Sequence, residues 1–326
     1  MRPSLKILDI FIGNKCNLTC FQCDTRSDII RTGKHDPTIE SIKEGILLAQ
    51  EHFVIETYSI LGGEPLLYLD KVREIVAFIR EHDTVTRILL PTNGTVLPKY
   101  MDKLVALVKD YNVCVAVCDH FAGFEDPKRS NKISASVEEL VTRLELTLQS
   151  PDIFWQGFLD WQNVKRDPLW QAFVDVRGSM IDQDDIIYAN NKVWVQVKSQ
   201  SHFQSHYKLV DGKPKPFMSK DPATSYNKSC PSTFCSFMQD KKLYKCGALG
   251  TLDRFLDYHN VKSDPDWQKY IAYKPLDLTN CTAEEVAHFS DTKYCHVDEC
   301  DMCPAESGHY FLKTPDKVIP IRKVNG

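Results

Sequence analysis

Residues 6–23 read KILDIFIGNKCNLTCFQC, an apolar run followed at once by cysteines at positions 16, 20 and 23. The run from Lys6 to Ile12 predicts a short buried β-strand, because its residues are nearly all apolar and it is too short for a typical helix. Three thiols then lie within eight residues of one another, directly after this strand. Such a group of thiols at the end of a strand predicts a metal site or a catalytic site.

Three thiols are one fewer than a closed metal site normally needs. Thiolates select zinc, copper(I) or iron–sulfur clusters, and structural zinc sites usually have four ligands in paired spacings. The nearest histidine, His35, stands at no characteristic spacing from the C-x3-C-x2-C loop. A cubane cluster held by Cys16, Cys20 and Cys23 would leave one iron open for chemistry, and the spacing favours that arrangement.

Strands and helices alternate through the first 150 residues. Apolar runs at 54–61, 87–91 and 113–117 predict strands, and amphipathic patterns predict helices at 37–52, 70–81, 98–110 and 136–148. Asp36 is the expected cap of the first helix, and Ser136 with Glu139 forms a capping box for the last. The alternation of apolar strands with helices predicts an α/β fold with a parallel sheet, as an open sheet or a partial barrel.

Polar or glycine-rich segments follow each predicted strand. Gly62-Gly63-Glu64-Pro65, Thr92-Asn93-Gly94 and Asp119-His120 come after successive strands, as the cysteine loop does after the first. Ligand sites of parallel α/β folds lie at the carboxyl ends of the strands. We therefore expect these segments to gather on one rim.

The composition argues against a membrane protein, a nucleic-acid-binding protein and a secreted disulfide-rich protein. The chain has 326 residues, 43% hydrophobic residues, a formal net charge of −4 and twelve cysteines. It contains no apolar run of the roughly 18 residues that a membrane helix needs, and its charge argues against nucleic acid as the main partner. The N-terminus does not match a signal peptide, so the cysteines are expected to bind metal in a cytoplasmic protein rather than to form disulfides.

The cysteine loop followed by the GGEP segment resembles the radical S-adenosylmethionine (SAM) superfamily over roughly residues 6–200. The resemblance implies a partial (β/α)6 TIM-like barrel. It also implies that Cys16, Cys20 and Cys23 hold a [4Fe–4S] cluster with an open iron for S-adenosylmethionine, that Gly62, Gly63, Glu64 and Pro65 line the methionyl amino group, and that Thr92 and Asn93 meet the ribose.

The chemistry implied by the resemblance is reductive cleavage of S-adenosylmethionine to a 5′-deoxyadenosyl radical, which abstracts a hydrogen atom from a small-molecule substrate. The electron would come from a donor such as flavodoxin or ferredoxin. The protein would contribute positioning and exclusion of water.

Seven further cysteines follow residue 229. Cys230 and Cys246 flank a predicted hairpin that turns at Asp240-Lys241, and Cys300 and Cys303 form a C-x2-C pair. This pattern resembles the twitch domain, a shorter relative of the SPASM domain, and implies a second [4Fe–4S] cluster on these four thiols. Cys235 is a competing or additional ligand, Cys281 and Cys295 could serve a further cluster, and a structural zinc site is the alternative. We place the domain boundary near residue 205, giving a barrel at 1–205 and an auxiliary domain at 206–326.

Cys118 lies near the predicted rim. It is a core residue or, in the sharper hypothesis, a hydrogen donor to a substrate radical, which would indicate an epimerase. Asp119 and His120 are expected to be rim contacts or solvated loop residues.

Three radical reactions remain open on this sequence. One is dehydrogenation of a small polar substrate such as a sugar or cyclitol, with the auxiliary cluster as electron acceptor. The others are peptide modification and epimerisation. The early first cysteine leaves no room for an N-terminal leader-binding domain, which lowers the expectation of a peptide substrate. A non-catalytic metal-binding interaction protein is the alternative outside catalysis, although such a protein would have no use for GGEP beside three thiols.

Overall fold

The computed structural model describes residues 2–20, 23–27, 29, 33, 36–121, 127–150, 186–199, 206–230, 232 and 234–305. The chain forms two compact units, the first comprising residues 1–86 and 202–326 and the second residues 87–201. The first unit therefore contains both the N-terminal cysteine loop and the C-terminal cysteines. The predicted boundary near residue 205 stays a prediction.

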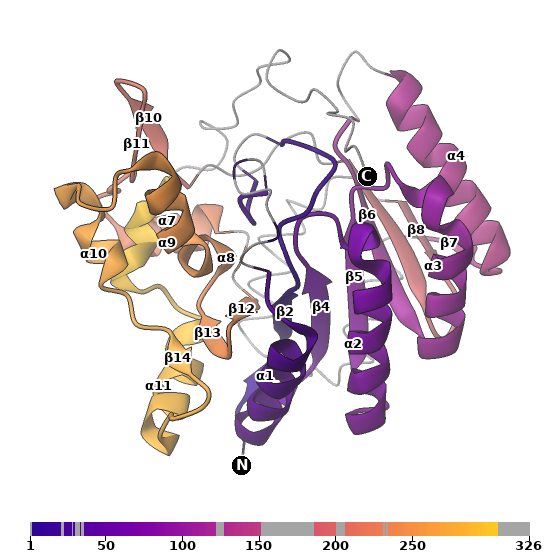
Figure 1. The fold of residues 1–326 in the computed structure, drawn as a ribbon, viewed down its shortest axis with the longest axis horizontal. Coiled ribbons are helices and arrows are strands. Elements are labelled where there is room, and N and C mark those ends of the chain that lie inside the picture. The colour runs from indigo at the N-terminus through magenta and orange to yellow at the C-terminus, as the bar shows by residue number, and fades with distance from the viewer. Residues whose placement is uncertain are drawn as a thin grey trace. The chain divides into compact units, whose positions relative to one another are not determined.

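The first unit is built on strands from both ends of the sequence, in the order β14–β13–β12–β2–β4 (Figure 1). Their bounds are Ile7–Phe11 (β2), Thr57–Leu61 (β4), Cys235–Gln239 (β12), Lys242–Tyr244 (β13) and Leu276–Asp277 (β14). β2 runs parallel to β4 on one side and to β12 on the other. β13 and β14 continue the sheet antiparallel, and Ser4–Leu5 (β1) pairs in parallel with Val54–Ile55 (β3). The C-terminal segment thus extends the N-terminal sheet by main-chain hydrogen bonds.

The register gives this sheet two different faces. Ile10 pairs with Ile60 and Met238, and the Met238 sulfur lies 3.2 Å from the position of a Cβ on Gly45 in helix α1 (Ile39–His52). Because side chains alternate along a strand, Asp9 points to the face opposite α1.

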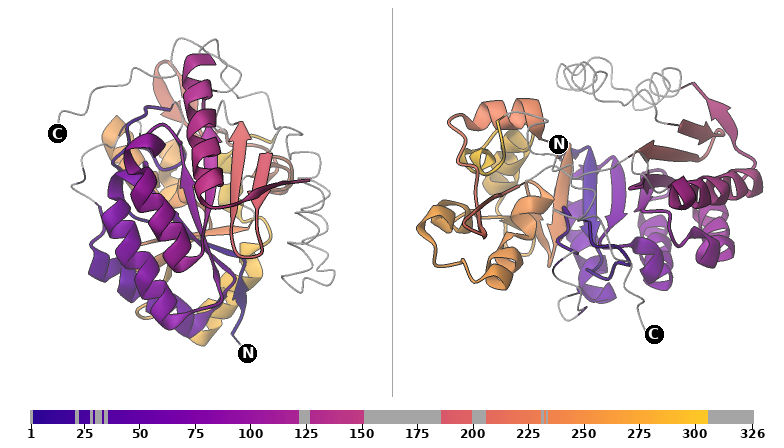
Figure 2. Two further views of the ribbon diagram at one scale, coloured as in Figure 1. Left: turned by 90° about the vertical axis from the view of Figure 1, so that its right-hand side faces the viewer. Right: turned by 90° about the horizontal axis from the view of Figure 1, so that it is seen from above.

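The helical elements of the first unit bury one side against this sheet or against each other. They are α1, Pro65–Tyr68 (η2), Leu69–His82 (α2), Pro222–Ser229 (α7), Gly247–Gly250 (α8), Leu252–His259 (α9), Pro265–Trp267 (η3), Gln268–Ile271 (α10), Ala283–Lys293 (α11) and Asp298–Met302 (η4), with a hairpin of Lys208–Val210 (β10) and Lys213–Lys215 (β11). The C-terminal helices share a core that includes Phe255, Leu256, Trp267 and Tyr270. Figure 2 shows them gathered beside β12.

The second unit has three parallel strands, Arg87–Thr92 (β5), Val113–Asp119 (β6) and Trp194–Ser199 (β9). Ile186–Ala189 (β8) and Thr147–Gln149 (β7) add antiparallel strands, and the helices are Leu97–Tyr111 (α3) and Pro127–Arg143 (α4). The predicted start of the last helix at Ser136 is wrong. Ser136 lies inside α4, where its hydroxyl donates to the Lys132 carbonyl one turn back at 2.8 Å.

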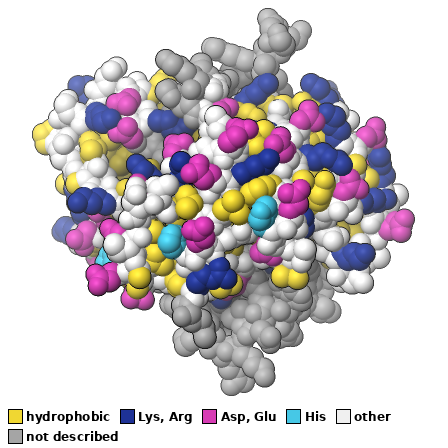
Figure 3. All heavy atoms as spheres, turned by 60° about the horizontal axis from the view of Figure 1, so that its bottom comes forward, with side chains coloured by type: hydrophobic (Ala, Val, Ile, Leu, Met, Phe, Trp, Pro, Cys, Tyr) yellow, Lys and Arg dark blue, Asp and Glu magenta, His cyan; other side chains and the backbone are white. Residues whose placement is uncertain are grey.

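The predicted α/β class, with parallel strands and the strand–helix alternation of a partial barrel, is confirmed. No helix in the described part of the chain combines the length and the apolar character needed to cross a lipid bilayer. Acidic and basic side chains are interspersed over the face shown in Figure 3.

Candidate functional site

The ends of β2 and β4 bring the cysteine loop and the GGEP segment together, because Phe11 pairs with Leu61 at the last register position. Beyond it, the Gly63 amide donates to the Gly13 carbonyl at 2.8 Å and the Glu64 amide donates to the Lys15 carbonyl at 2.9 Å. The segment that enters the cysteine loop is therefore held by main-chain bonds to the segment after β4.

This approach requires glycine at two positions. A Cβ on Gly62 would lie 2.5 Å from the Gly13 carbonyl oxygen, and one on Gly63 would lie 2.3 Å from the Lys15 carbonyl oxygen. Both distances are far inside van der Waals contact, and neither oxygen can move without breaking the loop. The two glycines thus position the cysteine loop, a role separate from the cosubstrate contact predicted for them.

The two ends of the cysteine loop are tied to each other. The side-chain Nδ2 of Asn14 donates to the Thr25 carbonyl at 2.9 Å, and the Thr25 hydroxyl donates to the Gly62 carbonyl at 2.9 Å. The same hydroxyl lies 3.3 Å from the Cys23 sulfur. These bonds close the loop that carries Cys16, Cys20 and Cys23 at its base.

Asp36 braces the loop instead of capping the first helix. Its carboxylate accepts from the Asn14 amide at 2.8 Å and from the Tyr68 hydroxyl at 2.6 Å, and that hydroxyl accepts from the Lys15 amide at 2.6 Å. The cap of α1 is Thr38, whose hydroxyl accepts from the Ser41 amide. The predicted cap was wrong because the Asp36 carboxylate is hydrogen-bonded to Asn14 and Tyr68 instead of to the first turn of α1.

Glu64 is fully buried. One carboxylate oxygen accepts from the Leu66 amide at 3.0 Å and so caps the short helix η2. Its predicted role as counter-charge to a methionyl amino group stays a prediction, as does the cosubstrate contact of Pro65, which begins the same helix.

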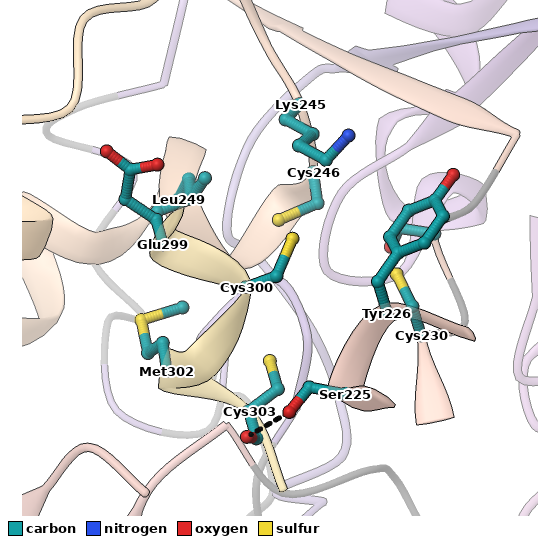
Figure 4. Close-up of a pocket in the computed structure, with 11 residues that line it drawn as sticks. Ser225, Tyr226, Cys230, Lys245, Cys246, Leu249, Glu299, Cys300, Met302 and Cys303 are labelled. Carbon is teal, nitrogen blue, oxygen red and sulfur yellow. Dashed lines mark hydrogen bonds between the residues drawn. The ribbon is translucent and has the colours of Figure 1, made fainter. Parts of the chain in front are cut away.

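A second group of thiols lines a cavity in the C-terminal part of the first unit (Figure 4). Cys230 ends helix α7, Cys246 precedes α8, and Cys300 and Cys303 lie in and after η4. In Figure 4 the side chains of Cys246 and Cys300 point toward one another, with Cys303 and Cys230 around the same space. The structure thus brings together the four cysteines predicted to hold the second cluster.

The raised pKa values of the thiols in this cavity favour binding of a positively charged metal core by thiolates. Burial raises the pKa of the Cys300 thiol to about 12, and it raises the pKa of Cys303 and of Cys246 as well. Cys230 raises the pKa of each of them further, because like charges would be close together. A bound metal core removes this penalty by taking up thiolate charge.

One buried lysine lines the same cavity, and a second, Lys293, donates to the carbonyl of the lining residue Ser232. Lys245 lines it and donates to the carbonyls of Thr292 and Lys293, at 2.8 and 3.0 Å, and of Cys295. Lys293 is 1% exposed, and burial lowers the pKa of its ammonium to about 8. These two ammonium groups offset part of the negative charge that an iron–sulfur core carries with four thiolates, and the Glu299 side chain lines the cavity as well. The donor set and its surroundings fit a [4Fe–4S] cluster.

The other C-terminal cysteines lie elsewhere. Cys235 is hydrogen-bonded to the Asp9 carboxyl and does not line the cavity. The Cys281 sulfur lies 3.4 Å from Nε2 of His52, and Cys295 is exposed. We leave these three out of the proposed ligand set, and a role for any of them in metal binding stays a prediction.

Within the described ranges, no three cysteine, histidine, aspartate or glutamate side chains meet as the ligands of one metal ion would. A cluster spreads its ligands over the corners of a cube, whereas a zinc ion needs all four sulfurs within ~2.3 Å of one point. Metal analysis separates the two possibilities directly.

The second unit holds the remaining predicted residues at the ends of neighbouring parallel strands. Thr92 ends β5, and its hydroxyl accepts from the Gly94 amide at 3.1 Å; Asn93 accepts from the Thr95 amide at 3.0 Å. Cys118 is half-buried near the end of β6. The convergence of these strand ends within the unit is confirmed by the pairing of Thr92 with Val117.

Asp119 and His120, at the end of β6, are both buried. The Asp119 carboxylate accepts from the Phe121 amide at 2.8 Å and from the Ser130 hydroxyl at 2.6 Å. Asp119 therefore joins the end of β6 to helix α4. Its burial contradicts the expectation that Asp119 lies in a solvated loop.

Residues 10–152 match the family model of the radical SAM superfamily. These residues form a radical SAM domain. The match includes the cysteine loop and the GGEP segment, and it makes S-adenosylmethionine and a [4Fe–4S] cluster the cofactors that the family implies for this domain.

Individual proteins resemble parts of the chain. This chain is 34% identical over 110 residues to a 7-carboxy-7-deazaguanine synthase of Methanothermobacter thermautotrophicus, covering 33% of this chain and 40% of the relative. It is 36% identical over 94 residues to a probable GTP 3′,8-cyclase of Methanococcus maripaludis, covering 28% and 30%. The matches thus span well under half of these relatives.

Among solved structures, BtrN in complex with AdoMet and 2-DOIA is similar over 98% of this chain and 100% of its own length, with 15% identity and a TM-score of 0.44.

Asp9, in β2 of the first unit, is a candidate functional residue that was not expected from the sequence. Its side chain is partly exposed on the sheet face opposite α1. Burial raises the pKa of its carboxyl to about 7, although hydrogen bonds with Ser59 and Cys235 lower that pKa. A carboxyl that titrates near neutral pH can exchange a proton with a bound molecule. The signal was present as a lone acid in an otherwise apolar strand.

Gly63→Ala is expected to disturb the cysteine loop. The new Cβ would meet the Lys15 carbonyl oxygen, and such overpacking costs about 1–3 kcal/mol. We expect a lower thermal midpoint and less iron retained on the loop. Gly45→Ala is the matched control, because its nearest contact is the flexible Met238 side chain at 3.2 Å and alanine favours a helix by about 1 kcal/mol. Equal effects of the two variants would contradict the proposed role of Gly63.

Asp9→Asn is expected to stabilise the protein more at about pH 8 than at about pH 5. The pKa of the Asp9 carboxyl is about 7 in the folded protein and 3.8 in its ordinary state. Folding therefore takes up a proton between these values, and the charged form costs stability above pH 7, by about 4 kcal/mol at most. Asparagine removes that cost.

Thermal midpoints at the two pH values provide the measurement for Asp9. The exposed Asp70→Asn serves as the control and should show the same change at both pH values. A gain for Asp9→Asn that does not depend on pH would rule out the raised pKa.

Proposed function

We propose that this radical SAM protein is an oxidoreductase that removes hydrogen from a small polar substrate, such as a sugar or cyclitol, with a second [4Fe–4S] cluster as electron acceptor. The observation that supports the proposal is the cavity lined by Cys230, Cys246, Cys300 and Cys303, which lies in the same compact unit as the cysteine loop. A reaction without net oxidation has less need of a second redox centre.

Each part of the chain has a role in this proposal. Cys16, Cys20 and Cys23 would hold the first cluster, and the segments at 62–65 and 92–93 would line S-adenosylmethionine. The bound cofactors would supply the 5′-deoxyadenosyl radical that takes a hydrogen atom from a substrate C–H. Gly62, Gly63 and Asp36 hold the cysteine loop in place, and the position of the loop would determine where the radical forms.

Oxidation of an alcohol carbon requires the loss of one further electron and one proton. The second cluster would accept the electron, and a carboxyl that titrates near pH 7 could accept the proton. Asp9 meets that description among the groups on its face of the sheet. An external reductant such as flavodoxin or ferredoxin would supply the first cluster.

A purine-derived substrate is the second candidate. It is favoured by the names of the relatives, which are a 7-carboxy-7-deazaguanine synthase and GTP 3′,8-cyclases. Cys118 as a hydrogen donor, and with it an epimerase, stays a prediction.

Iron and sulfide analysis tests the two-cluster arrangement. Anaerobically reconstituted protein is expected to hold about eight iron and eight sulfide ions per chain, and about four of each when Cys16, Cys20 and Cys23 are all replaced by alanine. Replacement of Cys230, Cys246, Cys300 and Cys303 should likewise leave about four, while Cys235→Ala should leave the count unchanged. Zinc in the C-terminal site would exclude the second cluster.

The reaction is tested by anaerobic incubation with S-adenosylmethionine and dithionite. We expect 5′-deoxyadenosine from the wild-type protein and only background amounts from Cys16→Ala. Deuterated aminocyclitols, purine nucleotides and peptides are then compared as substrates. Transfer of deuterium into 5′-deoxyadenosine identifies the class, and transfer from peptides alone would exclude the proposed small substrate. Absence of 5′-deoxyadenosine from cluster-loaded protein would favour a non-catalytic role.

A further inference from the structure

Three consecutive residues after Cys23, namely Asp24, Thr25 and Arg26, connect the two proposed cluster sites within the first unit. We call this segment the strap. Its middle residue belongs to the cysteine loop, since the Thr25 hydroxyl lies 3.3 Å from the Cys23 sulfur and donates to the Gly62 carbonyl. Its two outer residues both contact the C-terminal part of the unit.

Asp24 reaches the auxiliary site through one histidine. Nε2 of His206 lies 3.0 Å from the Asp24 carboxylate, and Nδ1 of the same ring lies 3.4 Å from the Cys303 sulfur. His206 is buried. One imidazole therefore joins the strap to a cysteine of the four-thiol cavity.

Arg26 is an unusual residue for its position. Its side chain is 2% exposed, its backbone has φ of 58°, and its Nε finds no hydrogen-bond partner among the described residues. The guanidinium carbon lies 4.7 Å from the centre of the Phe255 ring and 5.6 Å from that of Tyr207. A left-handed backbone and a buried charge are both costly for a residue other than glycine.

The guanidinium of Arg26 lies close to the auxiliary site. The two rings it stacks on, Phe255 and Tyr207, belong to the buried cluster against which Cys246 and Cys303 pack. The stacked rings hold the guanidinium in place through cation–π contacts. Water would screen the interaction at the surface but screens it little in the interior.

We propose that Arg26 raises the reduction potential of the auxiliary cluster and so makes it a better electron acceptor. The inference rests on the proposed function, because it requires that cluster on Cys230, Cys246, Cys300 and Cys303. One-electron reduction adds one negative charge to the cluster, and a buried cation nearby stabilises the reduced form more than the oxidised form. No proton or ligand changes place in this step.

The experiment uses full-length protein in which Cys16, Cys20 and Cys23 are alanine, so that the auxiliary cluster alone is present. Its midpoint potential is measured by anaerobic titration with dithionite, followed by electron paramagnetic resonance. We expect Arg26→Gln and Arg26→Met to shift the midpoint to more negative values and Arg26→Lys to retain most of the parent value. Arg254→Gln is the matched control, because Arg254 also stacks on a ring, that of Phe11 at 4.9 Å, and should leave the midpoint near that of the parent.

The outcomes are separable. An unshifted midpoint in both neutral variants, or a shift in Arg26→Lys as large as theirs, would overturn the role of the charge. Loss of the cluster in both neutral variants, with or without loss in Arg26→Lys, would show that Arg26 is needed to hold the cluster and not to set its potential, and would overturn the proposal. A parent protein that binds no four-iron cluster would refute the proposed function itself.

Discussion

The contact between the main chain after β2 and the main chain after β4 is the constraint on which the rest of the first unit depends. Two hydrogen bonds, from Gly63 to Gly13 and from Glu64 to Lys15, fix the entry to the cysteine loop. They can form only because positions 62 and 63 carry no Cβ. The free energy of each bond is modest, about 1 kcal/mol, but together they decide where three thiols stand relative to the parallel strands.

Charge is the second organising factor. Four thiols in one buried cavity oppose each other's ionisation, while Lys245, Lys293 and Arg26 bring positive charge into the same interior. Neither set is favourable by itself, because a buried charge needs a counter-charge. A metal core with thiolate ligands would satisfy both, and folding and metal binding would then be coupled. The buried cations are therefore best understood together with the cavity.

The sequence predicted the features that depend on neighbouring residues or on a repeating pattern. Strand and helix periodicity led to the α/β class, and the hairpin turn at Asp240-Lys241 was correct, with both residues at positive φ. Local rules failed where a distant group intervened. Asp36 bonds Asn14 and Tyr68 instead of capping a helix, and the Ser136 capping box lies inside a helix that begins nine residues earlier. His206 and Asp24 are 182 residues apart, so no short pattern could have paired them.

The C-terminal segment is built into the first unit at several levels. β12 pairs in parallel with β2, and Arg254 donates to the Asn14 side chain at 2.8 Å, next to the cysteine loop. Asn14 in turn bonds Thr25 at the far end of that loop. A change in the C-terminal helices would therefore reach the base of the cysteine loop through two hydrogen bonds. Because one of these bonds is buried and the other half-buried, they tie helix α9 firmly to the base of the loop that carries Cys16, Cys20 and Cys23.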